Sequence, residues 1–282
     1  MPGHAAPADS RSPPERGGTR LTTVAPGLTL LAALGVSLAG WRAHALSGSG
    51  AVAAWMVGTL VLWGGGWQGG AVLAAFFVSS SLVSRLTLPA SGLDPKGDRR
   101  DHRQVWANGG PAALGALLGF CCGEAGLWVI TGSLAAAAAD TWATAIGSRS
   151  GTPPRLLWSG RIVPPGTNGG VTVLGSVGAL AGALLVAATG ALASGGPRLL
   201  PLATAIGFAG MLLDSTLGAV LQGRFLCPAC GASSEWRVHR CGTPTVRQGG
   251  IAWLDNDGVN LAATTAAALL ALAGWVLCGQ PL

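Results

Sequence analysis

Eight apolar runs, separated by short polar segments, constrain the fold of this chain more than any other feature. They cover residues 24–39, 51–63, 71–86, 105–120, 127–146, 171–193, 199–221 and 259–277. Several approach the ~20 residues that an α-helix needs to cross the hydrocarbon core of a bilayer, whereas 51–63 is short and needs its glycine-rich flanks to do so. We therefore predict an all-α, polytopic integral membrane bundle of about eight transmembrane helices.

The composition agrees with a membrane protein and excludes an ordinary soluble domain. Half of the 282 residues are hydrophobic, 10% are charged, and the mean hydropathy is +0.51. The net charge of +6 would suit a nucleic-acid-binding protein, but the basic residues lie between the apolar runs and form no basic face. We therefore expect membrane lipids around the chain and no nucleic-acid partner.

The chain divides into a short tail and one membrane domain. Residues 1–20 are rich in Pro, Gly and charge, which predicts a disordered tail. We expect 21–282 to form a single membrane domain with a Cys/His-rich loop at 223–250. Ala43-His44-Ala45 fits a signal-peptidase site, but this pattern is common in an Ala-rich chain, and cleavage of the first helix stays open.

Basic residues concentrate in three of the loops. The segments 85–103, 148–169 and 222–250 hold twelve of the 17 lysines and arginines. With eight helices these loops fall on one face, which the positive-inside rule makes cytoplasmic. We therefore expect a multi-pass protein of the cell membrane whose active-site loops are cytoplasmic.

Polar residues recur at helical spacing where four of the predicted helices meet that face. Asp140 lies one turn from Thr144, and Asp214 lies one turn from Gly218. The other two helices contribute Gln104 with Asn108, and Asn256, Asp257, Asn260 and Thr264. Two carboxylates in one bundle repel each other unless a cation joins them, which favours a cation-binding pocket. Hydrogen bonding between helices is the alternative use of such residues.

A glycine-rich turn separates the fifth and sixth apolar runs. It reads Gly166-Thr167-Asn168-Gly169-Gly170 and comes directly before the run that begins at 171. A glycine turn that opens a helix leaves backbone N–H groups free to bind an anion. Together with Asp140 and the arginine-bearing loop, this turn completes the components of a site for a metal-bound phosphate.

Six segments carry a resemblance to a known family. They are RQVWANGG (103–110), DTWATAIG (140–147), PRLL (154–157), VPPGTNGGVTVLG (163–175), LLDSTLGAVLQ (212–222) and LDNDGVNL (254–261). They resemble the integral membrane family of domain of unknown function number ninety-two, which includes the plant phytyl-phosphate kinase and transmembrane protein nineteen. The resemblance implies a distant relative of dolichol kinase and CDP-diacylglycerol synthase, which hold a CTP-type nucleotide and Mg²⁺. The family often has Glu where this chain has Ala145.

The residues and the resemblance together predict a membrane transferase. We expect it to move a phosphoryl group from a nucleoside triphosphate, with CTP favoured, to an isoprenoid monophosphate of phytyl or polyprenyl type. The expected Mg²⁺ ligands are Asp140, Asp214 and Asp257, and the two acids Asp140 and Asp214 act in catalysis with Arg103 and Arg161. The expected nucleotide- and phosphate-binding residues are Gly166, Thr167, Asn168, Gly169, Gly170, Asn108, Asn256 and Asn260.

Two other functions stay open at this point. A lipid-phosphate cytidylyltransferase would use the same cation and glycine turn but release pyrophosphate. A cation-coupled transporter would use Asp140 and Asp214 as a transit site. The isoprenoid length, the nucleotide base and the oligomeric state, including a homodimer, are left open by the sequence.

A separate motif lies between the last two apolar runs. Cys227, Cys230, His239 and Cys241 form a Cys₃His set within 15 residues, which matches a zinc complement. A cytoplasmic loop disfavours a disulfide, and four protein ligands leave no open position for catalysis. We therefore expect a structural Zn²⁺, with free thiols as the alternative.

Overall fold

The computed structural model describes residues 25–87, 99–194, 196–234, 236–239 and 241–278. The predicted disordered tail, 1–20, lies outside the described residues. The helices are α1 (Pro26–Arg42), α2 (Gly48–Leu86), α3 (His102–Cys122), α4 (Glu124–Gly147), α5 (Val173–Ser194), α6 (Leu199–Val220) and α7 (Asn256–Cys278). The short strands are β1 (Arg155–Leu156), β2 (Gly170–Val171), β3 (Arg224–Leu226), β4 (Ser233–Ser234) and β5 (Val246–Gly249).

The predicted polytopic helical membrane bundle is confirmed. Within the described ranges, six helices, α2 to α7, are long and apolar enough to cross a bilayer. Helix α1, with 17 residues, is not one of the six. The expected number of about eight separate helices is not confirmed, because the runs 51–63 and 71–86 both belong to α2.

Helix α2 is interrupted at Gly66, whose φ of 63° and ψ of −164° are not helical. A Cβ at Gly70 would lie 2.4 Å from Leu62 Cδ2, although residues eight apart along a straight helix are separated by about 12 Å. The guanidinium of Arg100 lies 5.5 Å from the Phe76 ring, and a Cβ at Gly50 would meet the Arg100 carbonyl. Both arms of α2 therefore reach Arg100, and the chain folds back on itself at Gly66.

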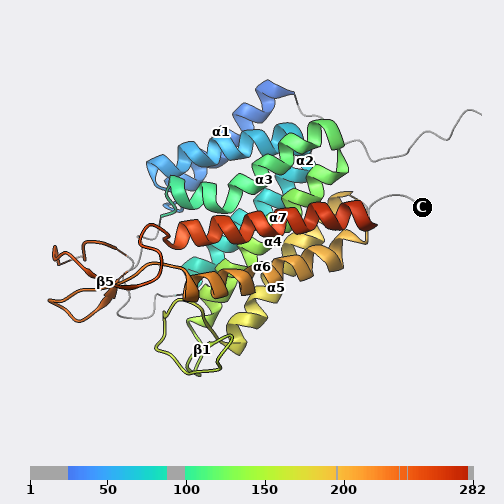
Figure 1. Cartoon of the computed structure of the whole chain (residues 1–282). Coiled ribbons are helices and arrows are strands. Elements are labelled where there is room, and N and C mark those ends of the chain that lie inside the picture. The colour runs from blue at the N-terminus through green and yellow to red at the C-terminus, as the bar shows by residue number, and fades with distance from the viewer. Residues whose placement is uncertain (1–24, 88–98, 195, 235, 240, 279–282) are drawn as a thin grey trace, which may run out of the picture.

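Helix α4 forms the centre of the bundle, where it contacts α2, α3, α5, α6 and α7 (Figure 1). All its residues from Ala125 to Ala139 are buried. Small residues allow the neighbouring backbones to approach closely: a Cβ at Gly182 would lie 3.0 Å from Ala138 O, and one at Gly210 would lie 2.6 Å from Ala136 Cβ. Asp140 directly follows this buried stretch.

The strands lie at one end of the bundle, where Figure 1 shows β1 and β5 projecting from the same side. β1 pairs antiparallel with β2, and β3 pairs antiparallel with both β4 and β5. Beyond α4, the Arg149 side chain donates to the Leu86 carbonyl at the end of α2, so segments distant in sequence meet at this end.

The start of α5 differs from the expectation. The sixth apolar run was expected to be helical from 171, but Gly170 and Val171 pair with β1, and α5 begins at Val173. The Thr172 hydroxyl accepts a hydrogen bond of 3.0 Å from the Gly175 N–H and so caps the first turn. The glycine turn is therefore joined to α5 through a short strand.

Candidate functional site

A cavity of about 620 Å³ opens where α2, α4 and α6 reach the strand-bearing end of the bundle. It is lined by side chains from these helices, by the start of α5 and by the glycine turn at 166–170. Asp140 and Asp214 both line it, as do Gln222 and Asn256. Residues that are far apart in the sequence, on helices and on a loop, therefore line the same cavity.

The two carboxylates of the cavity have little electrostatic compensation. Asp214 is 8% exposed, and its Oδ2 atom is buried with no hydrogen-bond partner among the described residues. The described lining contains no lysine or arginine. A buried carboxylate without a partner is costly, and a second carboxylate in the same cavity, Asp140, adds repulsion. The arrangement is therefore chemically suited to binding a cation.

The glycine turn packs directly against α6, next to Asp214. Gly166 and Gly169 have φ values of 80° and 76°, a region that glycine adopts without strain. A Cβ at Gly169 would lie 2.3 Å from Ala219 Cβ and 2.4 Å from Ser215 O, so only glycine allows this approach.

Part of the backbone hydrogen-bonding capacity of the turn is used internally. The Thr167 N–H donates to Pro164 O over 3.1 Å, and the Gly170 N–H donates to Thr167 O over 2.9 Å. The Thr167 hydroxyl also donates to Pro164 O, over 2.7 Å. The N–H groups of Asn168 and Gly169 take no part in these two backbone hydrogen bonds, and N–H groups in a turn of this kind are suited to an anion.

Hydroxyl groups make up much of the remaining cavity wall, and sequence reasoning missed most of them. They belong to Ser84, Thr87, Thr141, Thr144, Ser148, Ser150, Thr152, Thr172, Ser176 and Ser215, besides Thr167. Ser84 and Thr87 come from the end of α2, where the serine-rich segment 79–84 was the available signal. Hydroxyls both donate and accept hydrogen bonds, so this wall suits phosphate oxygens and metal-bound water.

The other polar stripes form a second cluster, between α3 and α7. Arg103 Nη2 lies 2.8 Å from Asp255 Oδ2, and Arg103 Nε lies 4.0 Å from Asp257 Oδ2. The Thr264 hydroxyl donates to Ala107 O over 2.8 Å, and the Asn108 amide donates to Gln104 O over 3.1 Å. As the structure describes the cavity, its lining does not include Arg103, Asn108, Asp257 or Asn260.

Two further predicted residues occupy different places. Arg161 is exposed on the loop between β1 and β2 and does not line the described cavity. Ala145, which stands where the resembling family often has Glu, does line it. The absent carboxylate would therefore project from the same helix as Asp140 and border the same volume.

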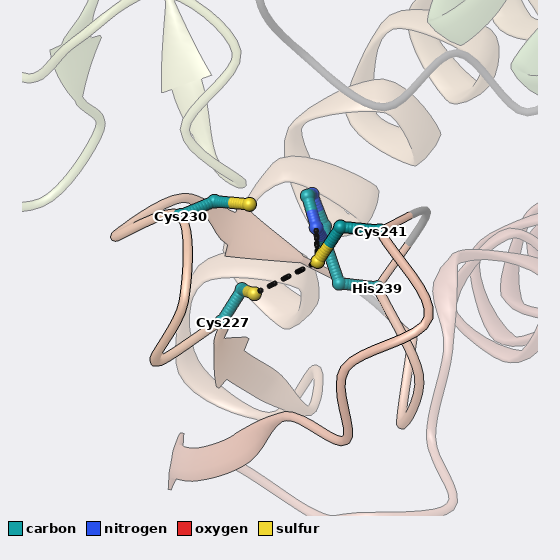
Figure 2. Close-up of side chains that lie close together, drawn as sticks. All are labelled: Cys227, Cys230, His239 and Cys241. Carbon is teal, nitrogen blue, oxygen red and sulfur yellow. Dashed lines mark hydrogen bonds between the residues drawn. The ribbon is translucent and has the colours of Figure 1, made fainter.

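The four residues of the Cys/His motif lie together in the loop between α6 and α7. Their ligand atoms all lie within 4.8 Å of one another. Figure 2 shows the three sulfur atoms and the His239 ring turned toward a common centre. Hydrogen bonds with Thr243 and His239 lower the pKa of the Cys241 thiol to about 5, whereas hydrogen bonds with Cys241 and Cys227 raise the pKa of Cys230 to about 11.

Comparison with known proteins agrees with this architecture. The family model described as "Integral membrane protein DUF92" matches residues 31–268, which include every described residue of the cavity. The chain belongs to this family. This match confirms, at the level of the family, the resemblance drawn from the sequence segments. No solved structure matches the chain.

Three of the proteins similar to this chain come from three different organisms. An uncharacterized membrane protein of Methanocaldococcus jannaschii is 30% identical over 182 residues, which are 64% of this chain and 76% of the relative. Protein PGR of Arabidopsis thaliana is 29% identical over an alignment of 264 residues that covers 80% of this chain and 87% of the relative. An uncharacterized membrane protein of Synechocystis is 30% identical over an alignment of 184 residues that covers 61% of this chain and 70% of the relative.

Proposed function

We propose that this DUF92-family membrane protein is a transferase that moves a phosphoryl group from a nucleoside triphosphate, with CTP favoured, to an isoprenoid monophosphate. One observation carries the proposal. Asp140 and Asp214, from two different membrane helices, share a cavity with a glycine turn and a wall of hydroxyls, and the described lining has no basic side chain. This combination suits a divalent cation with phosphate groups.

The described residues fit Mg²⁺ at Asp140 and Asp214. Mg²⁺ keeps several waters and needs only one or two protein carboxylates, and Asp214 Oδ2 has no hydrogen-bond partner among the described residues. When bound, the ion would offset the negative charge of the nucleotide phosphates. Asp257 belongs instead to the α3–α7 cluster with Arg103, where we propose that it helps to fix the start of α7.

The chain would then position two anions against each other. An isoprenoid monophosphate is already a nucleophile, so the reaction requires no general base. One of its oxygens bonds to the γ-phosphorus, the bond from that phosphorus to the β,γ-bridging oxygen breaks, and the nucleoside diphosphate leaves. The N–H groups of Asn168 and Gly169, the cavity hydroxyls and the Asn256 amide would hold the phosphate oxygens. Arg161, exposed on the loop beyond β1, would have to move to reach them.

The alternatives differ in their products and paths. A cytidylyltransferase would use the same groups but attack the α-phosphorus and release pyrophosphate. A transporter requires access from both ends of the bundle. The cavity lies at the strand-bearing end, which favours an enzyme. We also propose that this end faces the cytoplasm, because most of the loop arginines lie there.

Thermal stabilisation of the purified protein in detergent tests the proposal. Mg²⁺ with CTP should raise the unfolding temperature more than Mg²⁺ with ATP, UTP or GTP, and CTP with EDTA should have little effect. A nucleotide at about 100 times its Kd stabilises the folded state by about 2.7 kcal/mol, which is a shift of roughly 5–10 °C for a protein of this size.

Two variants make the stabilisation experiment specific. Asp140→Asn should abolish the shift, whereas Glu124→Gln, which changes the acid at the opposite end of α4, should retain it. If no nucleotide stabilises the wild type in the presence of Mg²⁺, or if Asp140→Asn responds like the wild type, the proposed site is wrong.

A further inference from the structure

The loop between α6 and α7 contains two turns of the same construction. In the first, the Cys227 N–H donates to Ala232 O over 2.9 Å, and the Gly231 N–H donates to Cys227 O over 2.8 Å. In the second, the His239 N–H donates to Thr243 O over 2.9 Å, and the Gly242 N–H donates to His239 O over 2.8 Å. Each turn thus begins with one residue of the Cys/His motif and closes through a glycine.

The glycines of the two turns occupy equivalent positions. Gly231 directly follows Cys230 and has a φ of 66°, and Gly242 directly follows Cys241 and has a φ of 79°. Positive φ reverses the chain just after the second ligand of each turn and brings that ligand back beside the first. The second turn is one residue shorter, which accounts for its tight His-x-Cys spacing.

Two distances between the ligand atoms are close to those of a tetrahedral metal site, and all four atoms lie within 4.8 Å of one another. Cys227 Sγ lies 3.6 Å from Cys241 Sγ, and His239 Nδ1 lies 3.2 Å from Cys241 Sγ. Zn–S bonds of about 2.3 Å and Zn–N bonds of about 2.0 Å, at tetrahedral angles, separate two sulfurs by about 3.8 Å and a sulfur from a nitrogen by about 3.5 Å. A disulfide would require about 2.05 Å between sulfurs, and the structure holds these cysteines as free thiols.

We propose that Cys227, Cys230, His239 and Cys241 bind one Zn²⁺ that clips the two turns together. Three thiolates and one imidazole form a soft donor set with tetrahedral geometry, which selects zinc over Mg²⁺ or Ca²⁺. All four positions are filled by the protein, so the site is structural. Figure 2 shows that the ligands come from both turns, so the ion would join the two turns directly.

The site has a defined place relative to the cavity. At the base of the loop, the Gly223 N–H donates to Leu254 O over 2.9 Å, and the Ile251 N–H donates to Leu221 O over 2.8 Å. These hydrogen bonds hold the flanks of Gln222, which lines the cavity, and they do not involve the clip. Loss of zinc should therefore loosen the loop beyond this base while the membrane helices stay assembled.

Metal analysis of the full-length protein, purified in detergent without chelator, tests this inference. The wild type should contain about one zinc per chain. Cys230→Ser and His239→Ala should each lower the zinc content by about tenfold or more, because a missing ligand opens the site. His239→Cys should retain zinc as a Cys₄ site. The matched control is Cys278→Ser, which removes a free thiol at the far end of α7 and should leave the zinc content unchanged.

Hydrogen–deuterium exchange separates a clip from general unfolding. In Cys230→Ser, peptides from 224–249 should exchange faster, while those from α4 and α6 stay protected. Wild-type protein without zinc, protein with iron in its place, or equal zinc loss in Cys278→Ser would each overturn the inference. None of these measurements depends on the transferase activity. They therefore test the zinc site independently of the proposed function.

Discussion

At the scale of single residues, the two cavity carboxylates are unequally placed. Asp214 is nearly inaccessible and packs beside the glycine turn, while Asp140 is partly exposed at the end of the buried stretch of α4. Helical spacing in the sequence was sufficient to pair them, because both residues lie about the same distance from the ends of their helices. The hydroxyl wall was not foreseen, because Ser and Thr are common in membrane helices for packing alone.

Ala145 permits a test of how complete the cation site is. It lines the same cavity, so Ala145→Glu should add a third carboxylate and raise the affinity for Mg²⁺ by about tenfold, a gain of about 1.4 kcal/mol. Ala145→Gln, which has the same size without the charge, serves as the control. Titration of Mg²⁺ against thermal stability measures the effect. Equal affinities in Glu and Gln variants would place residue 145 outside the cation site.

At the scale of elements, the order of helices could be predicted from the apolar runs, but their arrangement around the bundle could not. Periodicity gives the polar face of each helix and its depth, and it placed Asp140, Asp214, Asp257 and Asn260 at one level. It does not say which helices are neighbours. The structure therefore separates these residues into the cavity and the α3–α7 cluster. The reversal at Gly66 was hidden because glycine is frequent throughout the chain.

The glycine turn is the element on which the phosphate site depends. Gly169→Ala combines a positive φ with a Cβ contact of 2.3 Å to Ala219, so it should destabilise the protein by about 1–3 kcal/mol and displace the turn. Nucleotide-dependent stabilisation should be lost. Gly151→Ala is the matched control. Gly151 lies in the same loop, and because a Cβ there would meet nothing within 4 Å, this variant should behave like the wild type. Normal nucleotide binding by Gly169→Ala would exclude the turn from the site.

At the scale of the whole molecule, the strands lie at one end of the bundle (Figure 1), and the cavity and the arginine-bearing loops belong to the same end. The basic loops indicated this grouping from the sequence, because an even number of crossings between them returns the chain to the same face. Helices α3 and α4 lie between the first and the second of these loops, and α5 and α6 lie between the second and the third. Of the basic residues in these loops, Lys96 and Arg240 lie outside the described part of the chain.

Accessibility in intact cells tests which side this end faces. In a variant with Cys121, Cys122 and Cys278 changed to Ser, Arg161→Cys should react with a membrane-impermeant thiol reagent only after permeabilisation. Arg198→Cys, between α5 and α6 at the opposite end, should react in intact cells. Labelling of Arg161→Cys from outside would reverse the orientation and remove the cavity from the cytoplasmic nucleotide pool.

Transfer of a position-specific phosphorus label tests the central claim most directly. Purified protein with Mg²⁺, an isoprenoid monophosphate and CTP labelled at the γ-phosphorus should yield labelled isoprenoid diphosphate, and CTP labelled at the α-phosphorus should yield an unlabelled lipid. Asp140→Asn and Asp214→Asn should each lower the rate by orders of magnitude, and the double variant should be little slower, because residues that hold one ion act as a unit. Label from the α-position in the lipid would make the protein a nucleotidyltransferase. Full activity in both single variants would contradict the account of the site.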